Sequence, residues 1–191
     1  MPDVRRTAFG KKLSEYPLQN GVLYDQEIRV RGCLAILLET SFLLSLVEIK
    51  KASETQKAMN SVLVLITKIF CAKESIKVIS EGLEAFGGVG YLEDSGLPAF
   101  FRNTQVLMIW EGTTNVLCLE FAKTLHVLGQ SGLESIAQYL RYAIDMAYLH
   151  PSEILYEKQE TFNPFQKVVY LYNAIMPLLS QITDSKRSLL G

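Results

Sequence analysis

The stretch LITKIFCAKESIKVISEGL, residues 65–83, decides the fold. Its apolar side chains recur at intervals of four and three residues, which places them in one stripe along an α-helix, whereas a strand would alternate at every second residue. The stripe consists of Leu65, Ile69, Ala72, Ile76, Ile79 and Leu83. Lys68, Lys73, Glu74, Lys77 and Glu81 fall off it. The stretch therefore predicts one long amphipathic helix.

Helical spacing continues on both sides of this stretch. Residues 26–51 are apolar around more of the circumference, which predicts a helix buried against at least two neighbours. Further helices are expected at 115–128, 133–149 and 165–182, with a break at Gly129 and Gly132, a kink at Pro177 and a polar, less regular segment at 151–163. No run alternates with period two for long, so no sheet is expected. The sequence predicts an all-α antiparallel helical bundle with extra C-terminal helices.

The composition is typical of a folded globular chain. Of 191 residues, 49% are hydrophobic and 20% charged, a length and balance that suit about one domain. The 19 Lys and Arg residues nearly cancel the 20 Asp and Glu residues, leaving a net charge of -1. A nucleic-acid or anionic-membrane partner normally requires a basic excess, so neither is expected.

The cysteines and histidines indicate neither a disulfide framework nor a metal site. Cys33, Cys71 and Cys118 lie far apart, form no CxxC pair and are odd in number, which favours a reducing intracellular compartment. His126 and His150 do not fall at ligand spacing from any cysteine or from each other, so no metal is expected.

Targeting and membrane signals are not recognised in the sequence. The N-terminal residues MPDVRR are not followed by an apolar core, as a secretory signal would be. The longest apolar stretch, residues 33–47, is interrupted by Glu39, Thr40 and Ser45 and is shorter than the ~20 residues that a span needs. We therefore expect no membrane span and a cytoplasmic or mitochondrial location.

A glycine-rich motif, EAFGGVGY, occupies residues 84–91. Glycines in this density allow positive φ and a close approach of the backbone to a ligand. A helix precedes the motif and no Gly-Lys-Ser/Thr follows it, so it is neither a dinucleotide fingerprint nor a P-loop. A loop over residues 87–98 would be long enough to be functional. The alternative is a helix C-cap followed by a turn.

A second motif, VLMIWEGTTN, occupies residues 106–115. Its apolar run leads to one carboxylate, Glu111, and desolvation there would raise the pKa toward the range of a general base. The hydroxyls and amides that follow at the start of a helix suit phosphate or hydroxyl groups. The alternative is that Glu111 only caps this helix.

The N-terminal segment RTAFGKKL, residues 6–13, places the guanidinium of Arg6 near the ring of Phe9. A forked cation beside an aromatic ring suits a pyrophosphate that carries a stacked ring. The alternative is the basic start of an ordinary helix.

In their order and spacing, the three motifs resemble the C-terminal helical domain of the acyl-CoA dehydrogenase family. That family shows Arg-x-x-Phe-Gly-Lys-x-Leu, then about two long helices, then Gln-x-x-Gly-Gly-x-Gly-Tyr, then Tyr/Trp-Glu-Gly-Thr. The resemblance covers residues 5–126. It implies that residues 1–128 form this domain and that residues 129–191 form an additional helical region.

The resemblance also implies a cofactor, a substrate and roles for particular residues. The cofactor would be FAD, the substrate a fatty acyl-CoA, and the assembly a homodimer or homotetramer. Glu111 would remove the α-proton while hydride leaves Cβ for the flavin, and Gly112 would lie against the thioester. Contacts with FAD, partly that of a neighbouring subunit, are implied for Arg6, Thr7, Ala8, Phe9, Glu84, Ala85, Phe86, Gly87, Gly88, Thr113, Thr114 and Asn115.

Several positions depart from the family pattern. Glu84 stands where Gln is usual, Asn103 where Asp is usual, and Tyr16-Pro17 where His-Gln is frequent. Glu84 and the spelling WEGTTNV are more similar to the bacterial alkylation-response flavoproteins and long-chain relatives. Full members carry a helical domain and a β-domain before the first motif, so we expect this chain to be a fragment. The alternative is a truncated, non-catalytic helical module that binds a relative or another protein.

Overall fold

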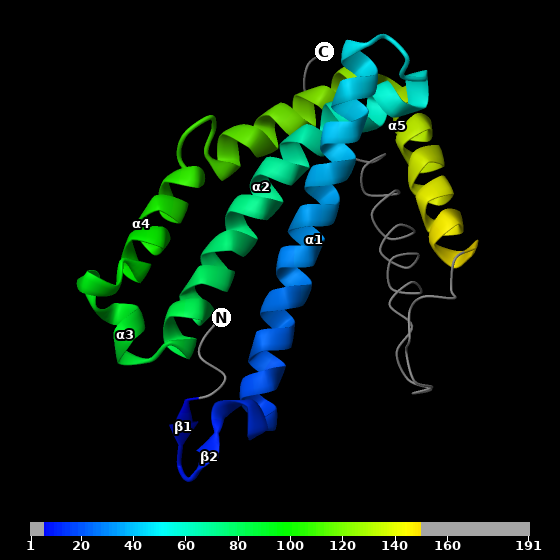
Figure 1. Ribbon diagram of the computed structural model, residues 1–191. Coiled ribbons are helices and arrows are strands. Elements are labelled where there is room, and N and C mark those ends of the chain that lie inside the picture. The colour runs from blue at the N-terminus through cyan, green and yellow to red at the C-terminus, as the bar shows by residue number, and fades with distance from the viewer. Residues whose placement is uncertain (1–5, 150–191) are drawn as a thin grey trace. The chain divides into compact units, whose positions relative to one another are not determined.

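The computed structural model describes residues 6–149 (Figure 1). The described residues are mostly helical, and their two strands have only two residues each, which confirms the all-α class. The predicted helix at 165–182, its kink at Pro177 and the segment 151–163 lie outside the described residues. The elements in order are β1 (Thr7–Ala8), β2 (Lys11–Lys12), the 3-10 turn η1 (Leu13–Glu15), α1 (Pro17–Glu48), α2 (Glu54–Ala85), α3 (Gly88–Tyr91), the 3-10 turn η2 (Glu93–Ser95), α4 (Leu97–Leu107) and α5 (Thr114–Leu149).

The described chain forms two compact units. Residues 6–42 and 63–120 belong to the first unit, and residues 43–62 and 121–149 belong to the second. All three motifs lie in the first unit. The boundary predicted at residue 128 stays a prediction.

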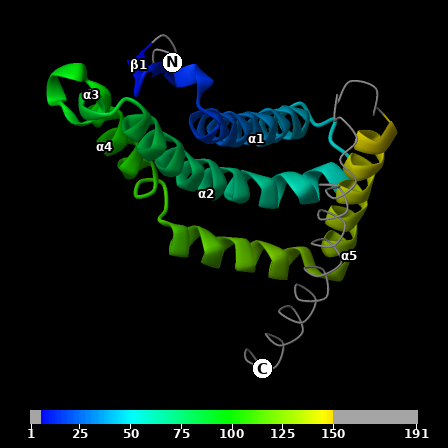
Figure 2. The ribbon, with the colours of Figure 1, turned by 90° about the horizontal axis from the view of Figure 1, so that it is seen from below.

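In the first unit, α1 and α2 run side by side, as the two views of the ribbon agree (Figures 1 and 2). Thr40 of α1 and Thr67 of α2 are both buried between the helices, and their hydroxyl oxygens lie 2.6 Å apart. Large apolar side chains of α1 lie elsewhere on its circumference and are half or more exposed, namely Leu34, Leu37, Leu38 and Phe42. Within the described residues, α1 therefore buries one stripe and not the two faces that we expected.

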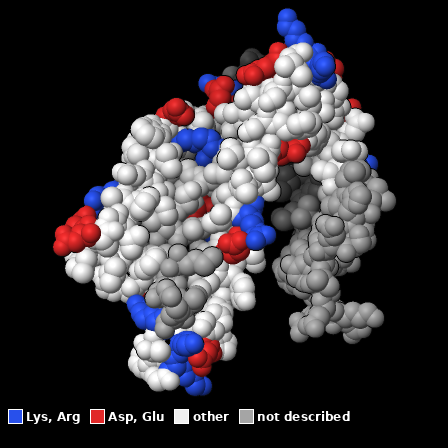
Figure 3. Space-filling view, in the orientation of Figure 1, with Lys and Arg blue, Asp and Glu red and all other residues white. Residues whose placement is uncertain are grey.

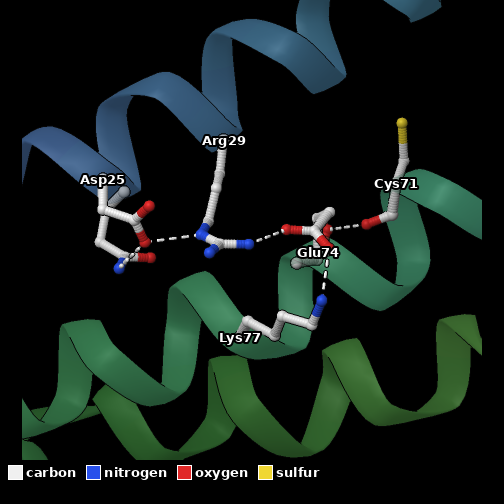
Figure 4. Close-up of polar contacts among 7 residues, drawn as sticks. Asp25, Arg29, Cys71, Glu74 and Lys77 are labelled. Carbon is white, nitrogen blue, oxygen red and sulfur yellow. Dashed lines mark hydrogen bonds and ion pairs between the residues drawn. The ribbon is translucent and has the colours of Figure 1, made fainter. Parts of the chain in front are cut away.

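An ion-pair network joins the polar face of α2 to α1 (Figure 4). Glu74 is off the apolar stripe, as predicted, yet it is only 8% exposed because α1 covers it. Lys77 Nζ donates to Glu74 Oε1 over 2.6 Å, and Arg29 donates from Nη1 to Glu74 Oε2 and from Nε to Asp25. Lys77 and then Arg29 lower the pKa of Glu74. Periodicity identifies the polar face of a helix but not the neighbour that packs against it.

The second unit has an apolar core. Leu43 is fully buried, and the side chains around the core come from the end of α1, the start of α2 and α5. Gly129 has non-helical angles, φ 60 and ψ -163, at the position where the sequence predicted a break. The buried members of this unit are Leu43, Ala58, Met59, Val62, Leu125, Leu133 and Ile136.

Helix α1 is longer than the apolar stretch on which the expectation of no membrane span was based. Among the described residues it is the one helix that length and composition would allow to cross a membrane: an 18-residue window has a mean hydropathy of 1.8 and is 11% buried. The sequence argument considered residues 33–47, whereas α1 has 32 residues. Core helices of water-soluble proteins meet the same criterion. Figure 3 shows uncharged groups over much of the drawn face, with charged groups in small, separate clusters.

Candidate functional site

The N-terminal motif forms a β-hairpin, so its interpretation as a basic helix start is wrong. Thr7 pairs with Lys12 and Ala8 with Lys11. Phe9 and Gly10, the two turn residues, have φ of 52 and 81, as in the tight turn that suits the twist of two strands. Tyr16 Oη lies 2.9 Å from the carbonyl oxygen of Ala8 and donates to this turn. The hairpin presents Phe9 with 98% of its surface exposed.

The glycine motif reverses the chain at the end of α2. Gly87 has φ of 65, a conformation that favours glycine, and α3 begins at Gly88. Gly90 is buried, and a Cβ at this position would lie 2.0 Å from the carbonyl oxygen of Leu83. The expected loop at 87–98 thus contains two helical turns, α3 and η2. The backbone therefore matches the alternative of a helix end followed by a turn. Gly87 and Gly88 are exposed in this turn and accessible to a ligand.

The first two motifs meet in space. Arg6 Nη1 donates to the carbonyl oxygen of Phe86 over 3.2 Å, although 80 residues separate them in sequence. The same guanidinium nitrogen lies 3.4 Å from the position that a Cβ on Gly87 would take. Arg6 is exposed, so a cation stands beside the bare backbone of the glycine turn.

An open cavity of about 410 Å³ adjoins this turn. Arg102 Nη1 and Nη2 donate to the two carboxylate oxygens of Glu93 over 2.7 and 2.9 Å, which ties α4 to η2. This paired contact lowers the pKa of Glu93 and raises that of Arg102. The lining residues are Leu83, Glu84, Gly87, Gly90, Tyr91, Glu93, Pro98, Phe101 and Arg102.

The third motif forms the connection between α4 and α5. Glu111 and Gly112 have φ of 55 and 109, and Lys68 Nζ donates to the carbonyl oxygen of Gly112 over 2.7 Å. Glu111 is exposed and its neighbour Trp110 is 55% exposed. The apolar surroundings that we expected around Glu111 are not formed by the described residues, because the two residues before it, Ile109 and Trp110, are more than half exposed.

The expectation that Glu111 caps α5 receives no support. The amide of Leu117 donates to the carbonyl oxygen of Thr113 over 3.0 Å, which is the first hydrogen bond of the helix. Thr113 therefore occupies the cap position. Thr114 and Asn115 are the first two residues of α5 and follow Glu111 closely in sequence.

The predicted site residues thus form two groups at opposite ends of α4. Arg6 to Phe9 and Glu84 to Gly88 lie at its N-terminal end, and Glu111 to Asn115 follow its C-terminal end. Lys68 of α2 contacts Gly112, and Glu84 lies 16 residues further along the same helix, so the groups are separated by roughly 24 Å along α2. Sequence reasoning missed Lys68 and Tyr16 as contacts of these groups. The only signal for Lys68 was a cation off the apolar stripe.

The chain is similar to a family of known proteins over most of its length. Residues 4–126 match the family model described as acyl-CoA dehydrogenase, C-terminal domain. The chain belongs to the acyl-CoA dehydrogenase family. This confirms the resemblance that the three motifs indicated.

Individual relatives agree with this assignment. Acyl-CoA dehydrogenase family member 11 from Caenorhabditis elegans is 39% identical over 132 residues, which are 69% of this chain and 21% of that protein. Putative acyl-CoA dehydrogenase AidB from Escherichia coli is 30% identical over 122 residues, 64% of this chain and 22% of that protein. The crystal structure of C. elegans ACDH-11 in complex with C11-CoA is similar with a TM-score of 0.72 and 34% identity, covering 75% of this chain and 24% of that one. The chain spans less than a quarter of the length of these relatives.

Proposed function

We propose that this chain is the C-terminal helical part of an FAD-dependent acyl-CoA dehydrogenase in which Glu111 is the base. The observation that carries the proposal is the contact of Arg6 with Phe86, which joins two motifs that are 80 residues apart. Through this contact, the N-terminal motif and the glycine motif lie next to each other in the structure.

The residues at this contact fit a cofactor that carries phosphate groups. A guanidinium has five donors in a fixed fork, and the bond to Phe86 occupies Nη1 of Arg6. A Cβ at Gly88 would meet nothing within 4 Å, so the backbone there is open to approach. A cation beside open backbone suits a pyrophosphate. Thr7, Ala8, Phe9, Glu84 and Ala85 are the further contacts that we propose for FAD.

The carboxylate group of the site lies at the other end of α4. When bound, FAD supplies the acceptor for the hydride that leaves Cβ of the substrate. Glu111 would take the proton from the α-carbon at a carboxylate oxygen. Gly112 would lie against the thioester. Thr113, Thr114 and Asn115 would offer hydroxyl and amide groups at the start of α5.

A base in this reaction needs shelter from water, which the described residues do not give Glu111. The chain spans less than a quarter of the C. elegans relatives described above, so we propose that the rest of a longer polypeptide and a second copy supply the cover. The exposed apolar side chains of α1 would be covered in the same homo-oligomer. The free thiols of Cys33, Cys71 and Cys118 agree with an intracellular location.

The decisive experiment replaces Glu111 in a complete polypeptide that holds FAD. Glu111→Gln should keep flavin and ligand binding, because the amide is nearly isosteric, and should lower the rate of flavin bleaching by acyl-CoA by about 10²–10⁴. Glu48→Gln, an exposed carboxylate at the end of α1, is the control and should bleach normally. Bleaching of the Glu111 variant at the normal rate would contradict the proposal.

A further inference from the structure

The backbone at Glu111 adopts a conformation that needs support. Glu111 has φ of 55, in the left-handed region that side chains other than glycine rarely adopt, and Gly112 follows with φ of 109. Such strained residues persist only where their surroundings hold them, and they concentrate at functional sites. The contacts that hold this pair therefore decide where the carboxylate of Glu111 points.

Two of the contacts are local to the connection between α4 and α5. The carbonyl oxygen of Val106 accepts hydrogen bonds from the amides of Ile109 and Trp110 over 2.9 and 3.1 Å. On the other side, the side chain of Leu117 packs against Gly112, where a Cβ would lie 3.1 Å from Leu117 Cδ2. These contacts fix the two ends of the connection but not the peptide that follows Gly112.

The third contact comes from a different element and carries a charge. Lys68, half-buried on α2, donates from Nζ to the carbonyl oxygen of Gly112 over 2.7 Å. This carbonyl is one residue from Glu111, so its direction is coupled to the backbone angles that aim the Glu111 side chain. Bonds from a charged donor are stronger than neutral ones, and α2 is a long helix that gives Lys68 a firm base.

We propose that Lys68 is a positioning residue for Glu111: its ammonium holds the Gly112 carbonyl and thereby keeps Glu111 in its strained, outward-facing conformation. The importance of this orientation rests on the proposed function, whereas the contact itself does not. Without the ammonium, the peptide after Gly112 can rotate, and the strained angle at the neighbouring Glu111 can relax.

Hydrogen exchange in the chain itself tests the proposal without cofactor or turnover. The amides of Ile109, Trp110 and Leu117 are bonded within the connection and report its opening. Lys68→Met keeps the length and helix propensity of the side chain and removes the donor. We expect exchange of these three amides to become about tenfold faster or more, while amides of α2 around Ala72 keep their rates.

Two further variants separate positioning from general stability. Lys68→Arg restores a charged donor and should return the three amides to slow exchange. Lys73→Met makes the same substitution at an exposed position on the same helix and should change nothing. Trp110, the one tryptophan of the sequence, gives a second signal: its emission should shift in Lys68→Met and not in the other two variants.

Several results would overturn the proposal. Unchanged exchange in Lys68→Met would do so, as would equal acceleration throughout α2 or a Lys68→Arg variant as fast as Lys68→Met. The proposed function can fail separately. Normal bleaching in Glu111→Gln together with fast exchange in Lys68→Met would contradict the role of Glu111 as the base and would still support Lys68 as its positioning residue. Lost bleaching in Glu111→Gln together with unchanged exchange in Lys68→Met would support Glu111 as the base and would contradict the positioning role of Lys68.

Discussion

Arg6 and Phe86 are joined by a hydrogen bond from a guanidinium nitrogen to a backbone carbonyl oxygen, 3.2 Å apart. The bond links the β-hairpin to the turn that ends α2. Because the donor is a side chain and the acceptor is backbone, replacing Arg6 removes the link without changing the turn. The contact therefore allows the cofactor role of Arg6 to be tested apart from the fold.

Replacing Arg6 should affect flavin retention far more than stability. The bond is exposed, so Arg6→Lys should change the free energy of unfolding by less than about 1 kcal/mol, measured by urea denaturation. In a complete polypeptide, the same variant should lose flavin on dialysis, because an ammonium lacks the fork that pairs with two phosphate oxygens. Lys12→Met, on the same hairpin, should lose none. Equal flavin retention in all three proteins would contradict the assignment.

The buried carboxylate of Glu74 predicts a pH-dependent contribution to stability. Lys77 and Arg29 lower its pKa in the folded chain, so the stabilisation is present above the unfolded value of about 4.3 and is lost as the pH falls through the folded value. Glu74→Gln should therefore cost about 2 kcal/mol at pH 7 and at pH 5. Below about pH 4.3 the difference from the wild-type chain should narrow.

The matched control for Glu74 is Glu81→Gln, an exposed carboxylate on the same helix. Denaturation curves at several pH values compare both variants with the wild-type chain. A cost of Glu74→Gln that persists undiminished at pH 2 to 3 would show that shape, and not charge, sets the effect.

The sequence predicted the helices and the three motifs but not the contacts that organise them. The spacing of Leu65 to Leu83 predicted a helix, and the structure confirms that these residues lie in one helix, α2. It cannot report that α1 covers Glu74 or that Lys68 reaches Gly112, since both depend on which helices become neighbours. The hairpin at Phe9 and Gly10 was missed because strands of two residues are too short to show alternation.

The candidate site was predicted as a set of residues and not as a geometry. The motifs indicated Arg6, the glycine turn and Glu111, but not that α4 separates the last from the others. The apolar run before Glu111 suggested burial, and the structure exposes it, because an apolar sequence determines burial only where a partner surface is present. The residues that form such a partner surface lie far from Glu111 in the sequence or in another chain, so the local pattern does not reveal them.

The thiols should differ in reactivity. Burial, and then the neighbouring Cys33, raise the pKa of Cys71 to about 11, whereas Cys118 is exposed. Only the thiolate reacts with iodoacetamide, and at pH 8 about one in a thousand Cys71 side chains is ionised. Peptide mass spectrometry should show Cys71 alkylated at least about a hundredfold more slowly than Cys118. Similar rates would contradict the half-buried position of Cys71 beside Cys33 of α1.

The tight turn that carries the glycine motif leaves no space for a side chain at Gly90. A Cβ at Gly90 would lie 2.0 Å from the carbonyl oxygen of Leu83, and a backbone atom cannot move aside as a side chain can. Gly90→Ala should therefore push α3 away from the end of α2 and cost about 1–3 kcal/mol of stability, or more. Gly88→Ala, two residues earlier, is the matched control, because its Cβ would meet nothing within 4 Å. Urea denaturation of both variants distinguishes packing from a general sensitivity of the loop: equal losses would mean that the approach of Gly90 to Leu83 does not hold the turn.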